Sequence, residues 1–340
     1  MKSKVVNVIG VMSPNNSFGQ LTQRFVLALD KAGYDIHFRN YWLNGEVDPV
    51  LKKFEKPLSV NSPYILVHWG QTCMVNEMHD GAIVYTMTEA SKITHEFVRI
   101  LNRASVIMVP TEFNKRVFLS SGVKRPIHVS PMGVDLSIYK PDMHNFPKST
   151  VFLTAGSNLS GKHRKGLDRV ITAFMLAFPN EQDVVLWVKT RPDDVIMQTY
   201  NPRIQHIKDN LDVPNMVSLY QKAFCFVSGS WGEGWGWHIN EAMACGKPVI
   251  SVRWGGVASY FKGDVHGADL AYTLTPYQDG YGLTGYGAVP SIESMATAMR
   301  DAYKNKIQYF LRGLQGYTDV QSLTLKNMQQ SFVNIVKRYV

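Results

Sequence analysis

Residues Ser228–Ala258 read Ser-Gly-Ser-Trp-Gly-Glu-Gly-Trp-Gly-Trp-His-Ile-Asn-Glu-Ala-Met-Ala-Cys-Gly-Lys-Pro-Val-Ile-Ser-Val-Arg-Trp-Gly-Gly-Val-Ala. The apolar run 224–227 just before them has the length of a buried strand, and residues 239–245 have the pattern of a helix. The glycines between these two segments are Gly229, Gly232, Gly234 and Gly236. Glycine permits positive φ and close approach of a ligand to the backbone, and the first amides of a helix lack intrahelical partners. This order of strand, glycine loop and helix predicts a site that suits a phosphate group.

Two carboxylates flank the predicted phosphate site. Glu233 lies in the glycine loop and Glu241 in the following helix, eight positions further on. At that spacing one carboxylate has room to meet a sugar while the other meets a ribose. The sequence Gly-Lys-Pro at 246–248 then ends the helix, and the apolar run 249–252 predicts another buried strand. A glycine loop that merely turns between strand and helix is the alternative interpretation.

The string Glu-Gly-Trp-Gly…Glu-Ala-Met-Ala-Cys-Gly-Lys-Pro-Val-Ile resembles a motif of the retaining nucleotide-sugar glycosyltransferases of the GT-B fold, sequence family 4. This resemblance implies that Glu233 contacts the transferred sugar and that Glu241 holds the ribose hydroxyls. It also implies that the loop between them binds the pyrophosphate. The implied donor-binding residues of this segment are Gly232, Gly234, Trp235, Gly236, Trp237, Asn240 and Glu241. The length of the match favours this function over a simple turn.

A basic segment follows another predicted strand, at 151–155. The loop 156–165 ends in Lys-His-Arg-Lys and leads into a predicted helix at 166–178. Cations and unpaired amides at a helix N-terminus together suit two phosphates, although a solvated charge run is the alternative. Arg-Lys-Gly here resembles the family's second donor motif, which implies catalytic roles for Arg164 and Lys165 beside Glu233. The further implied donor contacts are Gly156, Ser157 and Lys162, with Ser157 standing where relatives often carry a basic residue.

The N-terminal half begins with a predicted strand at 5–12, a polar loop at 13–19 and a helix at 18–32. This order predicts a doubly wound α/β domain, whose ligands collect at the carboxyl ends of the strands. By resemblance this domain seats the acceptor. The cleft residues implied are Asn16, Ser17, Phe18, Gly19, Thr88, Glu89 and Lys115. Relatives usually carry a glycine pair where only Gly19 stands, and many carry a histidine near Thr88.

Composition restricts the class of protein. The chain has 340 residues, 45% hydrophobic and 19% charged, which is typical of globular proteins of two domains. Its formal net charge of +9 favours an anionic partner, which a nucleotide sugar, an acidic lipid surface or a nucleic acid would satisfy. Cys73, Cys225 and Cys245 form no paired motif and are expected to be reduced. We expect no transmembrane segment or signal peptide and a cytoplasmic protein, in the host cytoplasm if it is viral.

The resemblance predicts an α/β protein of the GT-B class, with two Rossmann-like domains facing an interdomain cleft. The predicted boundaries are 1–145 for the N-terminal acceptor domain, 146–322 for the C-terminal donor domain and 323–340 for a helix crossing back to the N-terminal domain. We expect a long surface loop at 272–286 and final helices at 292–305 and 323–339.

The function predicted by the resemblance is retaining transfer of a sugar from a nucleotide-diphosphate sugar to an acceptor hydroxyl. The nucleotide sugar is a co-substrate, and no other cofactor is expected. The absence of an Asp-x-Asp sequence predicts metal-independent catalysis. The acceptor expected from relatives is a glycan or lipid-linked glycan. One alternative is a phage or viral enzyme that glycosylates a hydroxymethylated or already glycosylated base in DNA, and another is a nucleotide-sugar binding protein without turnover.

Overall fold

Long apolar runs form the strands of two separate parallel sheets. Val5–Gly10 is buried at five consecutive positions, and Thr150–Ala155 is buried throughout. Such runs are typical of parallel strands that are covered on both faces. The computed structural model describes residues 4–11, 13, 17–41, 48–142, 150–157 and 164–340.

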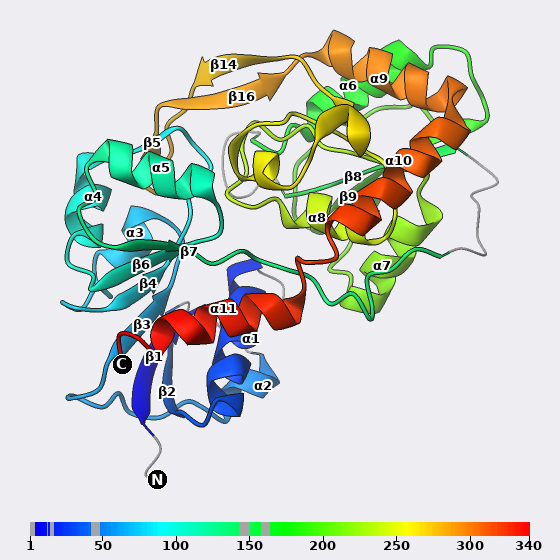
Figure 1. The fold of residues 1–340 in the computed structure, drawn as a ribbon. Coiled ribbons are helices and arrows are strands. Elements are labelled where there is room, and N and C mark those ends of the chain that lie inside the picture. Colours follow the sequence, from blue (N-terminus) through cyan, green and yellow to red (C-terminus); the bar gives the residue numbers. More distant parts are fainter. Residues whose placement is uncertain (1–3, 12, 14–16, 42–47, 143–149, 158–163) are drawn as a thin grey trace. The chain divides into compact units, whose positions relative to one another are not determined.

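The chain divides into two units, each built on one of these sheets and its own hydrophobic core (Figure 1). Unit 1 consists of Met1–Met132, Tyr277–Gly285 and Lys326–Val340. Unit 2 consists of Gly133–Pro276 and Tyr286–Leu325. The expected fold class, two Rossmann-like α/β domains, is confirmed by these two sheets.

Unit 1 holds a six-stranded sheet in the order β2-β1-β3-β4-β6-β7, with all neighbours parallel. Its strands are β1 (Val5–Gly10), β2 (Asp35–Asn40), β3 (Tyr64–Val67), β4 (Ile83–Tyr85), β6 (Val106–Val109) and β7 (Ile127–Val129). Its helices are α1 (Ser17–Lys31), α2 (Pro49–Lys52), α3 (Gly70–Met74), α4 (His95–Leu101), α5 (Glu112–Ser121) and, from Lys326 on, α11 (Leu325–Val336). The Thr111 hydroxyl caps α5, since it accepts a hydrogen bond from the amide of Asn114 (3.2 Å).

Unit 2 holds a second parallel sheet in the order β10-β9-β8-β11-β12-β13. Its strands are β8 (Thr150–Ala155), β9 (Val184–Thr190), β10 (Ile204–Lys208), β11 (Cys225–Val227), β12 (Val249–Ser251) and β13 (Gly267–Asp269). Its helices are α6 (Leu167–Ala177), α7 (Val213–Lys222), α8 (Trp237–Ala244), α9 (Ile292–Lys304) and α10 (Lys306–Asp319), with 3₁₀ turns η1 (Gly255–Ser259) and η2 (Gly263–Val265).

The segment 272–286 differs from the surface loop expected there. β14 (Tyr272–Pro276) pairs antiparallel with β16 (Tyr286–Pro290), and the tip between them belongs to unit 1. In unit 1, β15 (Leu283–Thr284) pairs with β5 (Lys92–Ile93), and the amide of Gln71 donates to the carbonyl of Tyr281 (2.5 Å). The prediction of a plain loop is wrong because the tip pairs its backbone and buries Leu283 in the core of unit 1.

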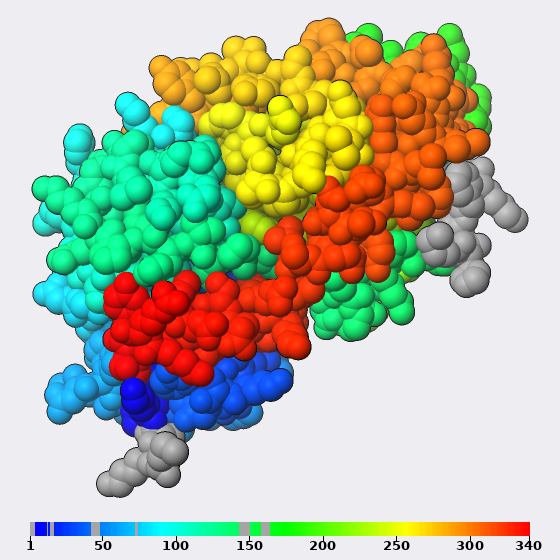
Figure 2. Space-filling view, in the orientation of Figure 1, coloured from blue at the N-terminus to red at the C-terminus, as the bar shows by residue number. Residues whose placement is uncertain are grey.

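The C-terminal region contains one helix more than expected, because α10 was not predicted between α9 and α11. The last helix packs on the first: Phe332 stacks on Phe25 of α1 with ring centroids 3.8 Å apart. In the space-filling view the C-terminal residues, in red, lie beside the N-terminal strands and helix, in blue (Figure 2). Among the described residues, no helix combines the length and apolarity needed to span a membrane.

Candidate functional site

The strand order of unit 2 places a ligand site between β8 and β11. These two strands are hydrogen-bonded neighbours. From β8 the chain continues to β9 and from β11 to β12, in opposite directions along the sheet. In doubly wound folds ligands bind at the carboxyl ends of the strands at such a switch point. The loop after β8 carries the basic segment, and the loop after β11 carries the glycine motif. The topology therefore unites two sequence signals that lie far apart along the chain.

Two glycines let these loops touch. Gly166 is in the left-handed region (φ +59°), and a Cβ there would lie 2.1 Å from the carbonyl oxygen of Gly229. A Cβ at Gly229 would lie 2.4 Å from the carbonyl oxygen of Gly166. No side chain fits at either position, so backbone packs directly on backbone. A pocket opens beside this contact, and its lining includes Thr154, Lys165, Ser230, Glu233, Gly236 and His238.

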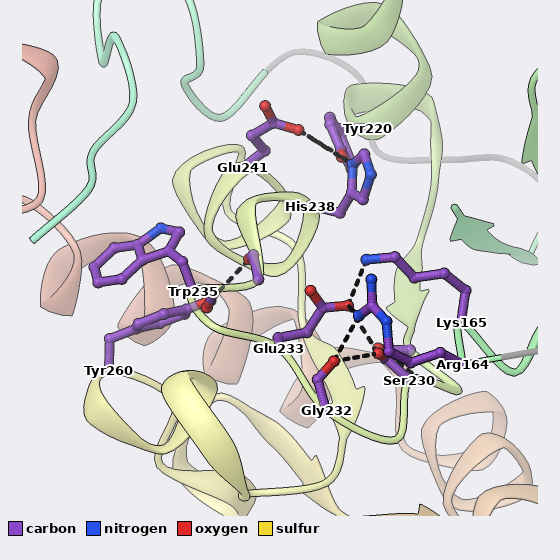
Figure 3. A network of polar contacts seen from close by, with 12 residues as sticks. Arg164, Lys165, Tyr220, Ser230, Gly232, Glu233, Trp235, His238, Glu241 and Tyr260 are labelled. Atoms are coloured by element: carbon purple, nitrogen blue, oxygen red, sulfur yellow. Dashed lines mark hydrogen bonds and ion pairs between the residues drawn. The ribbon is translucent and has the colours of Figure 1, made fainter. Parts of the chain in front are cut away.

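Glu233 lies at the centre of a charged cluster in this pocket (Figure 3). Its Oε1 accepts hydrogen bonds from Lys165 Nζ (2.5 Å) and Ser230 Oγ (2.8 Å), and Arg164 lies 3.5 Å away. Burial by itself would raise the pKa of Glu233, but the charges of Lys165 and Arg164, together with these hydrogen bonds, lower it to about 2. Glu233 is therefore a fixed anion at neutral pH, held against two cations.

Arg164 also braces the glycine loop. Its guanidinium donates to the carbonyl of Gly232 (2.7 Å), and the amide of Trp231 donates to the carbonyl of Arg164 (2.9 Å). The side chain is 7% exposed. Arg164 is thus built into the wall of the site, whereas the Lys165 ammonium reaches into the pocket.

Gly236 begins α8 in the left-handed region (φ +86°). A Cβ there would lie 2.8 Å from Val257, and Tyr260 Oη lies 2.8 Å from the carbonyl oxygens of both Trp235 and Gly236. The tight turn directs the first amides of α8 toward the pocket, where an anion would find donors and the positive end of the helix dipole. Trp235 itself is buried against Tyr260 with ring centroids 4.9 Å apart.

Glu241 is held from two sides. Its Oε1 accepts from the phenol of Tyr139 (3.1 Å), and its Oε2 accepts from the phenol of Tyr220 on α7 (2.8 Å). His238, one turn earlier on α8, lies 3.6 Å from Oε2 of the same carboxylate. The Glu241 side chain is 10% exposed, and the two phenols orient its carboxylate.

The remaining predicted donor contacts differ in their hydrogen-bond partners. The Gly156 amide donates to the carbonyl of Lys189 (3.1 Å), and Ser157 Oγ donates to Asp194 Oδ1 (2.9 Å). Trp237 directs its indole N–H to the carbonyl of Gly133 (3.3 Å). Asn240 is fully buried, and neither of its amide atoms has a hydrogen-bond partner among the described residues. Lys162 lies outside the described residues.

The predicted cleft residues of unit 1 follow strands β1, β4 and β6. Phe18 begins α1 after β1, and its ring lies 5.2 Å from that of Trp69, which follows β3. Gly19 packs against Ser13, since a Cβ at Gly19 would lie 1.8 Å from the carbonyl oxygen of Ser13. Thr88, after β4, is buried and accepts at its carbonyl from Asn114 of α5 (2.8 Å). Ser17 is exposed, Glu89 and Lys115 are half-buried, and Asn16 lies outside the described residues.

Several site residues were missed by sequence reasoning. Ser230 lies inside the quoted motif, and its spacing of three residues from Glu233 was the available signal. Tyr139 and Tyr220 gave no signal, because they are 102 and 21 residues from the Glu241 that they contact. Lys189 pairs in register with Ala155 of the pocket wall, and burial lowers its pKa.

Comparisons with known proteins identify the class of this fold. The structure of sucrose-phosphate synthase from Thermosynechococcus elongatus aligns over 99% of this chain and 99% of its own, with a TM-score of 0.74 and 14% identity. The Anabaena protein HepE, in complex with UDP and glucose, aligns over 98% of this chain and 100% of its own, with a TM-score of 0.72 and 12% identity. A glycosyltransferase from Rickettsia africae aligns over 100% and 99%, with a TM-score of 0.68 and 14% identity. These similarities show the GT-B fold.

Residues 149–283, which include both donor segments, match the family model described as Glycosyl transferases group 1. A search of curated protein sequences finds no match. The family whose model matches this segment is therefore the one that the motif resembles, the glycosyltransferase group 1 family.

Proposed function

We propose that the protein is a retaining, metal-independent glycosyltransferase that moves a sugar from a UDP-sugar to a hydroxyl of a glycan or lipid-linked glycan. One observation carries this proposal: the anion of Glu233 and the cation of Lys165 meet 2.5 Å apart at the switch point of unit 2. In this arrangement Lys165 faces the leaving diphosphate and Glu233 accepts hydrogen bonds from the sugar hydroxyls. Arg164, Gly156, Ser157 and Lys162, with the loop Gly232–Gly236 and α8, complete the proposed donor site.

The proposed chemistry is positioning and charge stabilisation. As the bond from the sugar to the diphosphate breaks, negative charge develops on the departing phosphate oxygen. Lys165 and the first amides of α8 are the positive groups at that place, and they are already ordered by Glu233 and Gly236. Preordered donors need no reorganisation during the reaction, which is why they lower the barrier. The acceptor hydroxyl attacks from the face that the diphosphate leaves, so the sugar keeps its anomeric configuration.

The choice of uridine follows the bound ligands of similar structures. HepE was solved with UDP-glucose, and the pneumococcal O-GlcNAc transferase GtfA with UDP and GlcNAc. The TarM structure from S. aureus also contains UDP. Three proteins of this fold thus hold UDP.

A glycan acceptor is favoured over DNA by the charges of unit 1. Duplex DNA needs several unpaired cations on one surface. On α4 and in the turn that follows it, Arg99 is bound to Glu96 (2.6 Å) and Arg103 to Asp80 (2.6 Å). These pairs reduce the positive field that a polyanion would meet. We assign acceptor contacts to Asn16–Gly19, Thr88, Glu89 and Lys115, at the carboxyl ends of the strands of unit 1.

The experiment is incubation of the purified protein with UDP-glucose, UDP-GlcNAc, GDP-mannose and ADP-glucose, each with and without chelator. Released nucleotide is measured by chromatography, and products with oligosaccharide or DNA acceptors by mass spectrometry. We expect turnover of a UDP-sugar that chelator does not reduce. Intact donors in every reaction would support a binding protein without turnover. A loss with chelator that manganese restores would contradict metal independence.

A further inference from the structure

We propose that Tyr220 is a positioning residue that couples Glu241 to His238 and so sets the hydrogen-bonding pattern of the donor site. This inference rests on the proposed function and on the ribose contact that the resemblance implies for Glu241. It assigns roles to two residues, Tyr220 and His238, that neither the motif nor the family match identifies.

The three side chains form one chain of contacts between α7 and α8 (Figure 3). Tyr220 Oη lies 2.8 Å from Glu241 Oε2 and 3.2 Å from His238 Nδ1. Tyr220 is fully buried, whereas the His238 side chain is 40% exposed and lines the pocket. A buried phenol therefore contacts both the carboxylate of Glu241 and the imidazole of His238 at the edge of the pocket.

Counting protons fixes the direction of these bonds. Burial, reinforced by the nearby charge of Glu241, raises the pKa of Tyr220 well above its ordinary value, so the phenol keeps its single proton. Glu241 accepts the hydrogen bond that the phenol donates, because an ionised carboxylate cannot donate. The phenol oxygen is then an acceptor toward His238, and Nδ1 must carry a hydrogen to complete the 3.2 Å contact. In the Nδ1–H tautomer of the imidazole, Nε2 is an acceptor that a hydroxyl of the ligand can use.

The same contacts fix the Glu241 carboxylate. Its Oε1 accepts a hydrogen bond from the phenol of Tyr139, and its Oε2 accepts one from the phenol of Tyr220. Two vicinal ribose hydroxyls would then meet a carboxylate whose direction is already set. Preordering of this kind reduces the entropy lost on binding. Loss of the phenol contact should therefore lower the affinity only of a ligand whose ribose hydroxyls bind the Glu241 carboxylate.

The test measures binding of UDP and of 2′,3′-dideoxy-UDP by calorimetry to the wild type and to Tyr220→Phe. We expect Tyr220→Phe to weaken UDP about tenfold, as loss of a hydrogen bond to a charged group does, and to leave dideoxy-UDP within about twofold. The matched control is Tyr309→Phe, because Tyr309 is equally buried in unit 2 and donates to the carboxylate of Asp301 (3.0 Å) away from the pocket. That control should leave both affinities unchanged. In a Glu241→Gln background, Tyr220→Phe should weaken UDP by less than it does in the wild type.

Spectroscopy of the imidazole gives a second readout. Nitrogen-15 shifts of His238 should report the Nδ1–H tautomer in the wild type and a loss of that preference in Tyr220→Phe. Equal weakening of both nucleotides would show a merely structural role for Tyr220 and overturn the inference. An Nε2–H tautomer in the wild type would overturn it as well. If the wild type bound neither nucleotide, the proposed function would fail and this inference with it.

Discussion

The ammonium of Lys165 lies 2.5 Å from the carboxylate of Glu233, although 68 residues separate them in the sequence. The contact joins the loop after β8 to the loop after β11. It also pairs Glu233 with Lys165, the cation that we propose for the diphosphate. Lys165 has three hydrogens to donate, so it can hold Glu233 and a phosphate oxygen together. This pair leads to the first two predictions.

Glu233→Gln should lower kcat about 100-fold or more, because the variant keeps the shape of the side chain but loses the charge that orders Lys165. UDP should bind at least as tightly as to the wild type, because Lys165 is released from its partner. Steady-state rates and calorimetry measure the two effects. Glu293→Gln, on the surface of unit 2, is the matched control and should change neither. Wild-type turnover in Glu233→Gln would contradict the assigned role.

Acid should destabilise the wild type more than Glu233→Gln. The pKa of Glu233 is about 2 in the folded protein, below its ordinary value of 4.5, so the folded state binds the proton more weakly than the unfolded chain. The ionised group therefore stabilises the fold above pH 4.5, and this contribution is lost as the pH falls toward 2. Thermal unfolding at several pH values between 5 and 2.5 should show a steeper fall of Tm in the wild type. Parallel curves would show that the pKa of Glu233 is not depressed.

Gly166→Ala should destabilise the protein more than Gly33→Ala. Both glycines have positive φ, which costs an alanine about 1–2 kcal/mol. At Gly33 nothing lies within 4 Å of a new Cβ, whereas at Gly166 the carbonyl oxygen of Gly229 lies 2.1 Å away. Urea denaturation should therefore show the larger loss for Gly166→Ala, together with weaker UDP binding. Equal losses would mean that the two loops separate without cost.

Duplex DNA should not bind measurably at physiological salt if the acceptor is a glycan. Binding to phosphates would release counterions and fall steeply with salt, so anisotropy titrations at two salt concentrations test the point. Replacement of Lys92, Lys115 and Arg116 by glutamine should then have no effect on DNA and none on UDP. Tight binding at low salt that this triple variant weakens would favour the DNA alternative.

Much of the donor site was predictable because its signals are local. A glycine loop between an apolar strand and a helix indicates a tight turn with unpaired amides wherever it occurs, since its backbone geometry depends on nearest neighbours. Glu233 and Lys165 are therefore predicted as site residues from sequence alone. Their direct pairing was not, and neither was the contact of Tyr139 with Glu241 across 102 residues. Helix α10 and the hairpin tip were missed because packing, not local preference, determines their structure.

The sequence by itself determined the class of fold, the family that its motif resembles and the residues expected to bind a nucleotide sugar, because these depend on short patterns of glycine, charge and apolar residues. Only the tertiary structure decided which groups meet. The order β10-β9-β8-β11-β12-β13 places the two predicted donor loops next to each other, at the carboxyl ends of β8 and β11, where Gly166 and Gly229 allow contact. Burial there holds the pKa of Tyr220 high, and the charges of Lys165 and Arg164 hold that of Glu233 low. Such effects depend on distances across the fold, which no local pattern in the sequence specifies.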